Sequence, residues 1–572
     1  MSTKKRARKI IASLLAVAAL ANFAACGVVL DDGEESSSTR PMDKTKTQIY
    51  IGNYNGGLGY KWLEDAILDF EETYNAEHPD DQVQLNIDNE KDKFLSSALK
   101  QSIRSNRQDM YILDDLDYYD FANTGLLADI TDVVVDETSG VSIESIMNDS
   151  LRNYYQIPEN AGFTATGGHY YGVPFYQSFY HLIYDKDLFE ENGFYLNEDG
   201  TGFIEPGSDE KRYGEEGTWN YGLPRTYSQF FMMLDHIKNS SVIPITWTGK
   251  YRDAYVPRYI STIMATYAGA DNFAANFSLN GEVEVLTSNS FAESPAKTFE
   301  KASLSTEKKA ITAENWVDLM ASQPSAYFAM KFAKDISNKD YLNVKVIRSL
   351  SETHILAQDT FLRSKPKSET KGEGQAIAML LEGAYWMNEA RASFNDIANE
   401  YGDDYSLENR NFGVMSFPVA DDETGDVTPT LAANGGSVIC VNQSSQHKDV
   451  VKEFIKFIHT EEQLKKFTET TYVKRPYDYT MSESEMAQMP TYVQDIMNLS
   501  NNANVVFTMP TNYKMFAKTD VKSPSWLFGS MVNSSSYKNP ILDFYDDTNL
   551  TALDYYKGII DYKSNYFSDY LQ

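Results

Sequence analysis

Cysteine is scarce in this sequence. Only Cys26 and Cys440 occur among its 572 residues, and this excludes a disulfide framework. Cys440 stands in the apolar run of residues 438–441, where we expect a small buried thiol. If Cys26 is modified, no second cysteine remains to pair with Cys440.

Catalytic and metal-binding motifs are also missing. The seven histidines are scattered, without the spacing of paired zinc ligands. No Gly-x-Ser-x-Gly elbow, phosphate-binding loop or dinucleotide fingerprint occurs. The acidic turns at residues 197–200 and 421–426 lack the full spacing of a calcium loop. We therefore predict no metal, no cofactor and no enzymatic activity.

Positive charge is in short supply. The chain has 51 Lys and Arg residues against 82 Asp and Glu, for a net charge of −31. Such a field repels nucleic acid and anionic lipid, so we expect no nucleic-acid partner. The hydrophobic content of 42% and the 39 tyrosines still allow a large interior. A chain of this length exceeds one ordinary core, and we expect at least two lobes.

The N-terminus has the pattern of an export signal. Five basic residues between Lys4 and Lys9 precede an apolar run at residues 10–21, which is shorter than the ~20 residues of a membrane span. This combination is typical of a secretory signal peptide. The run ends at Phe23-Ala24-Ala25-Cys26, which resembles a bacterial lipobox, although Phe23 replaces the usual aliphatic residue. We predict a lipoprotein signal peptide at residues 1–26 with lipid, such as palmitate, on Cys26. The alternative is ordinary cleavage nearby, with Cys26 incidental.

A polar segment follows the lipobox. Residues 27–46 contain almost no apolar side chains after Leu30, and such a segment cannot bury enough surface to repay its ordering entropy. A flexible tether of this length has a reach on the order of 25 Å. We predict that it connects an anchor to a folded body.

The start of the body alternates strands and helices. Residues 47–53 and 83–87 alternate apolar and polar side chains as strands do, and residues 110–113 are a short apolar run. Residues 62–75 repeat apolar side chains at helical spacing. This order predicts an α/β fold with a largely parallel sheet, whose ligands bind beyond the carboxyl ends of the strands.

Later segments continue the pattern. The sequence predicts a helix over residues 227–238 with Thr226 as its N-cap. It also predicts buried strands over residues 376–381 and 438–441, and an amphipathic helix over residues 449–458.

Five segments carry a resemblance to a known family. They are residues 53–57 (Asn-Tyr-Asn-Gly-Gly), 125–132 (Gly-Leu-Leu-Ala-Asp-Ile-Thr-Asp), 171–175 with 182–189, 378–386 (Ala-Met-Leu-Leu-Glu-Gly-Ala-Tyr-Trp), and 451–459 ahead of Glu461-Glu462. In this order they resemble the extracellular solute-binding lipoproteins of carbohydrate ABC importers, the maltose-binding-protein-like class. The lipobox agrees, because such proteins of Gram-positive bacteria are lipid-anchored.

The resemblance implies a fold and its boundaries. The fold is two-lobed, periplasmic-binding-protein-like of type II, with interleaved lobes and a hinge. It places lobe one at residues 47–175 plus 418–470, and lobe two at residues 176–417 plus 471–572. The crossings between lobes would lie at residues 172–180 and around 415–418.

The resemblance also implies a function. The protein would bind a carbohydrate, an oligosaccharide, on the outer face of the cell membrane. It would deliver this ligand to the membrane permease subunits of an ABC importer, and it would act as a monomer.

A sugar needs aromatic walls for its C–H faces and planar polar side chains for its hydroxyls. Residues of these types stand at predicted strand ends, at the hinge, and after residue 381. The candidate ligand contacts are Asn53, Tyr54, Asn55, Asp114, Asp115, Tyr176, Gln177, Trp247, Glu382, Tyr385, Trp386, Asn434 and Arg475. By resemblance, Tyr385 or Trp386 matches an aromatic residue that lies on the sugar face.

Several of these residues have plainer explanations that stay open. Trp386 suits a core position at the end of a helix, and Asp114 and Asp115 suit a helix cap. Arg475 suits a surface ion pair, and Asn434 a turn. At the level of the whole protein, the alternatives are a surface glycosidase and a binder of the same fold for another solute, such as a peptide or polyamine.

Overall fold

The computed structural model describes most of the body of the chain. It covers residues 40–566 except residues 55, 91, 139, 160–163, 288–299, 338–339, 352–354, 366–374, 424–426, 435 and 513–538. The predicted signal peptide with Cys26, most of the predicted tether, and the candidate Asn55 lie outside the described residues. Within the covered part, no helix combines the length and apolar character that crossing a bilayer requires.

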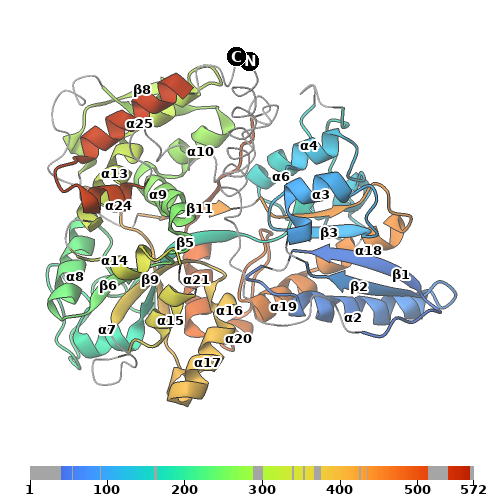
Figure 1. Ribbon diagram of the computed structural model, residues 1–572, viewed down its shortest axis with the longest axis horizontal. Helices are drawn as coiled ribbons and strands as arrows, with labels where there is room; N and C mark the ends of the chain where they lie inside the picture. The colour runs from blue at the N-terminus through green and yellow to red at the C-terminus, as the bar shows by residue number, and fades with distance from the viewer. Residues whose placement is uncertain are drawn as a thin grey trace, which may run out of the picture.

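Two lobes stand side by side, each built on its own sheet (Figure 1). The first sheet, on the right in Figure 1, has the order β2-β1-β3-β12-β4. Its strands are β1 (Thr47–Asn53), β2 (Val83–Asp88), β3 (Met110–Leu113), β4 (Val173–Pro174) and β12 (Val438–Val441). β1 pairs in parallel with β2 and β3, whereas β12 runs antiparallel to β3 and β4.

The helices of the first lobe cover this sheet with apolar faces. They are α2 (Lys61–Glu77), α3 (Ser96–Ser102), α4 (Tyr118–Asn123), α5 (Thr131–Val134), α6 (Asp149–Tyr155), α18 (Lys448–Ile458), α19 (Glu461–Thr471) and the short turn η1 (Asp92–Phe94). The helical spacing read from residues 62–75 buries Leu63, Ile67 and Phe70. The Phe70 ring packs on Phe454 of α18 with centroids 5.2 Å apart. The predicted strands and both predicted helices of this lobe are confirmed.

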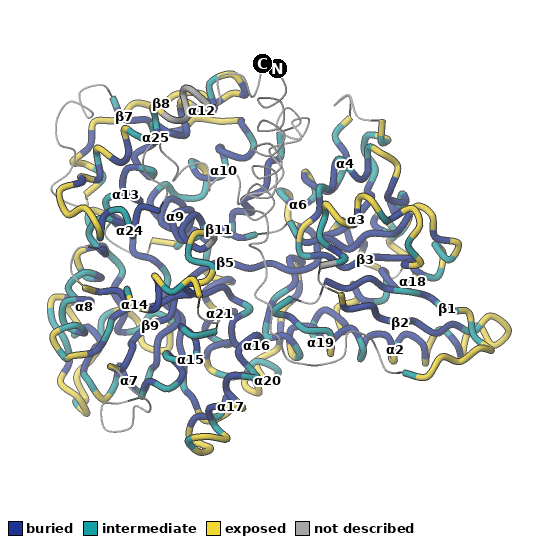
Figure 2. Tube along the Cα trace, in the orientation of Figure 1, coloured by how far each residue is buried: buried dark blue, intermediate teal, exposed yellow. Residues whose placement is uncertain are grey.

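The second lobe is larger. Its six-stranded sheet has the order β13-β11-β5-β9-β6, and β10 also pairs with β5. These strands are β5 (Ser178–Asp185), β6 (Ile243–Thr246), β9 (Ile377–Gly383), β10 (Phe412–Met415), β11 (Thr430–Asn434) and β13 (Asn504–Phe507). A separate hairpin consists of β7 (Glu282–Leu286) and β8 (Thr306–Ala310). Figure 2 shows the central strands as buried, whereas exposed residues gather on outer loops and helix faces.

Helices pack around this second sheet and form the outer part of the lobe. They are α7 (Lys186–Asn192), α8 (Tyr227–Asn239), α9 (Arg252–Ala268), α10 (Ala270–Ser278), α12 (Trp316–Ala321), α13 (Pro324–Ser337), α14 (Val344–Ile347), α15 (Leu356–Leu362), α16 (Trp386–Glu389), α17 (Arg391–Tyr401), α20 (Glu483–Met486), α21 (Thr491–Asn501), α24 (Pro540–Asp546) and α25 (Ala552–Tyr566), with short turns η2 (Lys301–Ser303) and η3 (Asp403–Tyr405). α8 begins where predicted: the Thr226 side chain accepts from the backbone N–H of Gln229, which bonds back in a capping box.

The chain crosses between the lobes more than once. The first crossing joins β4 to β5 through residues 175–177, within the predicted segment. The second joins β11 to β12, because β11 pairs with β5 and β13 of the second sheet. Residues 418–434 therefore belong with the second lobe, and the predicted crossing near residues 415–418 is corrected to residues 434–438. The predicted boundary at residue 471 also moves, since Arg475 bonds to backbone carbonyls of Phe175 and Ile458 beside the first lobe.

Candidate ligand-binding site

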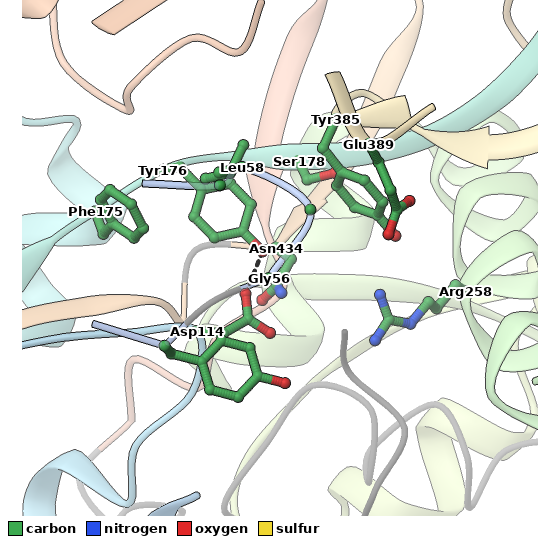
Figure 3. Close-up of a pocket in the computed structure, with 13 residues that line it drawn as sticks. Gly56, Leu58, Asp114, Phe175, Tyr176, Ser178, Arg258, Tyr385, Glu389 and Asn434 are labelled. Carbon is green, nitrogen blue, oxygen red and sulfur yellow. Dashed lines mark hydrogen bonds between the residues drawn. The ribbon is translucent and has the colours of Figure 1, made fainter. Parts of the chain in front are cut away.

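A cavity of about 600 Å³, part of it open solvent, lies where the two lobes meet. Both sheets contribute to it, because β1 and β3 end at its first-lobe wall and β5 begins at its floor. The lining residues are Tyr54, Gly56, Gly57, Leu58, Gly59, Asp114, Phe175, Tyr176, Ser178, Arg258, Tyr385, Glu389 and Asn434. Figure 3 shows Asp114 and Tyr176 on one side of this space and Arg258, Glu389 and Tyr385 across from them.

The first-lobe wall follows from the ends of its parallel strands. Tyr54 comes directly after β1 and Asp114 directly after β3, so the sheet brings them to one edge. The Tyr176 hydroxyl donates a hydrogen bond to the Asp114 carboxylate, the contact drawn dashed in Figure 3. This bond fixes a phenol ring and a carboxylate next to each other on the wall.

The second-lobe wall is a linked set of aromatic and charged groups. Arg258 of α9 donates to the Tyr180 hydroxyl, and its guanidinium lies 5.1 Å from the centre of the Tyr180 ring. The Tyr180 and Tyr385 hydroxyls are hydrogen-bonded at 2.9 Å. The Tyr385 ring lies so close to Gly383 that a Cβ there would come within 2.5 Å of a ring carbon. Glycine at the end of β9 therefore lets this ring rest against the backbone.

Two carboxyl groups near the cavity have altered acidity. The Glu382 carboxylate accepts from the Tyr255 hydroxyl at 2.6 and 2.8 Å, and its burial raises its pKa to about 7. Asp115 keeps an exposed side chain. Partial loss of hydration, together with the charges of Asp114 and Asp117, raises the pKa of the Asp115 carboxyl above its usual value. In both cases Arg258 partly offsets the effect.

The arrangement can hold a neutral, hydroxyl-rich ligand. Phenol rings from both lobes offer flat apolar faces, carboxylates accept hydroxyl protons, and the guanidinium of Arg258 and the amide of Asn434 can donate. Among the described residues, no cluster of three or more His, Cys, Asp or Glu side chains could hold a metal ion.

Comparison with known proteins decides the family. Residues 60–465 match the family described as bacterial extracellular solute-binding protein. The chain belongs to this family. No curated protein sequence matches the chain.

Solved structures of other solute-binding proteins share the fold. A chitin oligosaccharide binding protein superposes with a TM-score of 0.52 at 15% identity, covering 91% of this chain and 98% of the other. The apo form of RafE from Streptococcus pneumoniae gives a TM-score of 0.52 at 13% identity, covering 93% and 100%. The GacH receptor of Streptomyces glaucescens gives 0.50 at 14%, covering 92% and 98%. The predicted two-lobed α/β fold of type II is confirmed.

Within this solute-binding protein, the cavity brings together five of the predicted contacts. They are Tyr54, Asp114, Tyr176, Tyr385 and Asn434. Asp115 lies beside Asp114 without lining the cavity, and Asn55 is outside the described residues.

The two predicted tryptophans are in the interior. Trp386 is 0% exposed and packs against the rings of Phe361, Phe412 and Tyr492. Trp247 is 2% exposed and faces Tyr259 in the core of the second lobe. The prediction that these indoles stack on a ligand is corrected, since neither reaches the cavity surface. In the Tyr385-Trp386 pair, the ring that lines the cavity is that of Tyr385.

Three further predicted contacts are structural in this arrangement. Arg475 is 0% exposed and donates to the carbonyls of Phe175 and Ile458 at 2.9 and 2.8 Å, not to a surface acid. Gln177 is buried at the first crossing, where its backbone N–H donates to the carbonyl of Lys474. Asn53 donates to Asn89 at 2.9 Å behind the cavity wall. These polar groups satisfy buried partners, which is what a buried polar side chain requires.

Glu382 does not line the cavity either. Its carboxylate points to Tyr255 and its own strand end, where it also accepts from the Gly383 N–H at 3.0 Å. It supports the wall on which Tyr385 and Arg258 lie and is not itself part of the surface.

Sequence reasoning missed Arg258 and Glu389. Arg258 stands inside α9 among apolar residues, and nothing in its neighbourhood distinguishes it from a surface arginine. Glu389 did have a signal, because it follows Tyr385 by four residues and so shares its helix face. Trp386, one residue on, is turned by about 100° to the other face.

Proposed function

We propose that this solute-binding protein takes up an oligosaccharide between its lobes and passes it to the membrane permease subunits of an ABC importer. The observation that carries the proposal is the cavity itself, with phenol rings from both lobes around carboxylate, amide and guanidinium groups.

The similar structures support the ligand class. Those with a TM-score of at least 0.50 are described as binding chitin oligosaccharide, acarbose, and cyclic α-maltosyl-1,6-maltose, among others. Because the ligand touches both walls, it stabilises the closed arrangement of the lobes over the open one. A monomer suffices for this cycle, since one chain supplies both walls.

The protein acts as a binder without catalysis in this proposal. Incubation of the purified protein with neutral oligosaccharides, followed by chromatography of the sugars, distinguishes a binding protein from a glycosidase. We expect every sugar to be recovered intact while the matching one raises the melting temperature, because binding to the native state alone adds stability by mass action. Shortened products would establish a glycosidase, and a thermal response to peptides alone would establish the non-sugar binder.

We also propose that the mature protein is held on the outer face of the membrane of a Gram-positive cell by lipid on Cys26, through the tether of residues 27–46. The motif Phe23-Ala24-Ala25-Cys26 after a short apolar run supports this. Replacement of Cys26 by Ala is expected to abolish incorporation of labelled palmitate and to release the protein from the membrane fraction. Label that persists in Cys26→Ala would contradict the assignment, because the other cysteine, Cys440, is buried.

A further inference from the structure

A second hollow lies on the second lobe, apart from the cleft. It has a volume of about 1920 Å³ including open solvent, and we refer to it as the outer groove. Its walls are the segment 213–226, residues 415–423 and 427–429 at the end of β10 and in the β10–β11 connection, and the C-terminal end of α21. The side chains that matter most here are Tyr213, Trp219, Asn220, Phe417, Asn498 and Asn502.

The wall formed by segment 213–226 is fixed to the rest of the lobe. The Arg225 guanidinium lies 5.1 Å from the centre of the Tyr213 ring, and the Arg225 carbonyl accepts from the Val419 N–H at 2.9 Å. Arg212, just before the wall, stacks 3.9 Å from the centre of the Tyr195 ring. The groove therefore has the preformed shape that ligand sites generally have.

The lining of the outer groove repeats the chemistry of the cleft. The cleft combines aromatic rings with an amide, two carboxylates and one arginine, and the outer groove combines Tyr213, Trp219 and Phe417 with three asparagines, two glutamates and Arg225. Trp219 is only partly buried. Asn498 and Asn502 are exposed and stand four residues apart, on one face at the end of α21. Rings beside amides suit the C–H faces and hydroxyls of a sugar chain.

The outer groove does not depend on the cleft. All its lining residues belong to the second lobe, so opening or closing of the lobes leaves it intact. Thr428 and Pro429 line it just before β11, whereas Asn434 at the other end of β11 lines the cleft. A strand of five residues spans about 13 Å from first to last Cα, which separates the two sites.

We propose that the outer groove is a second carbohydrate-binding site, which holds a stretch of a longer neutral polysaccharide at the cell surface while the cleft takes up a shorter piece. Its size exceeds that of the cleft cavity, and because part of this space is open to solvent, a bound chain can continue beyond it. The protein would in this way stay close to the source of its own ligand.

Electrophoresis of the native protein through gels that contain soluble xylan, soluble starch or galactomannan tests the proposal. At least one polysaccharide is expected to retard the wild type. Trp219→Ala is expected to weaken that retardation at least tenfold, whereas Tyr385→Ala in the cleft retains it. Tyr401→Ala, which removes another half-buried ring on α17 away from both sites, is the matched control and should also retain it.

The outcomes separate the two sites. If none of the polysaccharides retards the wild type, or if Trp219→Ala migrates like the wild type, the outer groove is not a carbohydrate site. Retardation lost in Tyr385→Ala but kept in Trp219→Ala would overturn the groove and leave the cleft function standing. Should Trp219→Ala fail to fold, the exposed pair Asn498→Ala and Asn502→Ala replaces it, with the same expected loss.

Discussion

Replacement of Trp386 by alanine is expected to lower the free energy of unfolding by about 3–5 kcal/mol, the usual cost of removing a fully buried tryptophan. Four aromatic rings surround the indole, with centroids 5.3 to 6.0 Å away. Each of them loses its contact with the indole when alanine leaves a void in its place. The indole N–H has no hydrogen-bond acceptor among the described residues. The loss is therefore one of packing, and urea unfolding measures it directly.

Ligand affinity separates this explanation from a contact role. Because Trp386 does not line the cavity, the folded fraction of Trp386→Ala is expected to bind ligand within a few-fold of the wild type. Trp386→Phe keeps most of the ring contacts and should lose clearly less stability than Trp386→Ala. If Trp386→Ala were as stable as the wild type but unable to bind ligand, Trp386 would be a ligand contact and not a core residue.

Replacement of Tyr385 by alanine is expected to weaken ligand binding by about 10- to 100-fold. Burying an aromatic side chain against a partner stabilises by about 1.5–3 kcal/mol, and each 1.4 kcal/mol is a factor of ten in affinity. Tyr385 lines the cavity from the second lobe, and its hydroxyl is held by Tyr180. Calorimetric titration of wild type and variant with the same oligosaccharide gives the ratio.

Tyr385→Phe serves as the control for this change. It keeps the ring over the ligand and removes only the bond to the Tyr180 hydroxyl, so it should bind much more tightly than Tyr385→Ala. If Tyr385→Ala binds as well as the wild type, the aromatic wall on the second lobe is not part of the site.

Local signals predicted individual strands and helices well, whereas the two-lobed fold came from the family resemblance. The alternation in residues 47–53 and 83–87, the helical spacing in 62–75 and the Thr226 cap each act within a few residues of the chain, and each is found in the structure. The second crossing was misplaced because the family resemblance put it around residues 415–418, whereas lobe membership depends on strand pairing far away in sequence. β11 joins the second sheet through β5 and β13, and no local pattern reveals that choice.

The site was harder to predict than the fold. Strand ends pointed to Tyr54 and Asp114, and both line the cavity, because the carboxyl ends of parallel strands meet at one edge of a sheet. Residue type alone could not separate Tyr385 from Trp386, and the larger ring was the one placed inside. Residue type also misled at Arg475, whose charge suggested a ligand contact or a surface ion pair. Its side chain is fully buried, because it donates to backbone carbonyls in the interior.

The most direct test of a saccharide site between the lobes is calorimetric titration of the purified protein with the oligosaccharide that gives the largest thermal shift. We predict one tight site per chain, recovery of the sugar unchanged, and loss of that site in a variant that combines Tyr385→Ala with Arg258→Ala. The absence of heat with every neutral saccharide, or tight binding that survives the double substitution, would contradict the account.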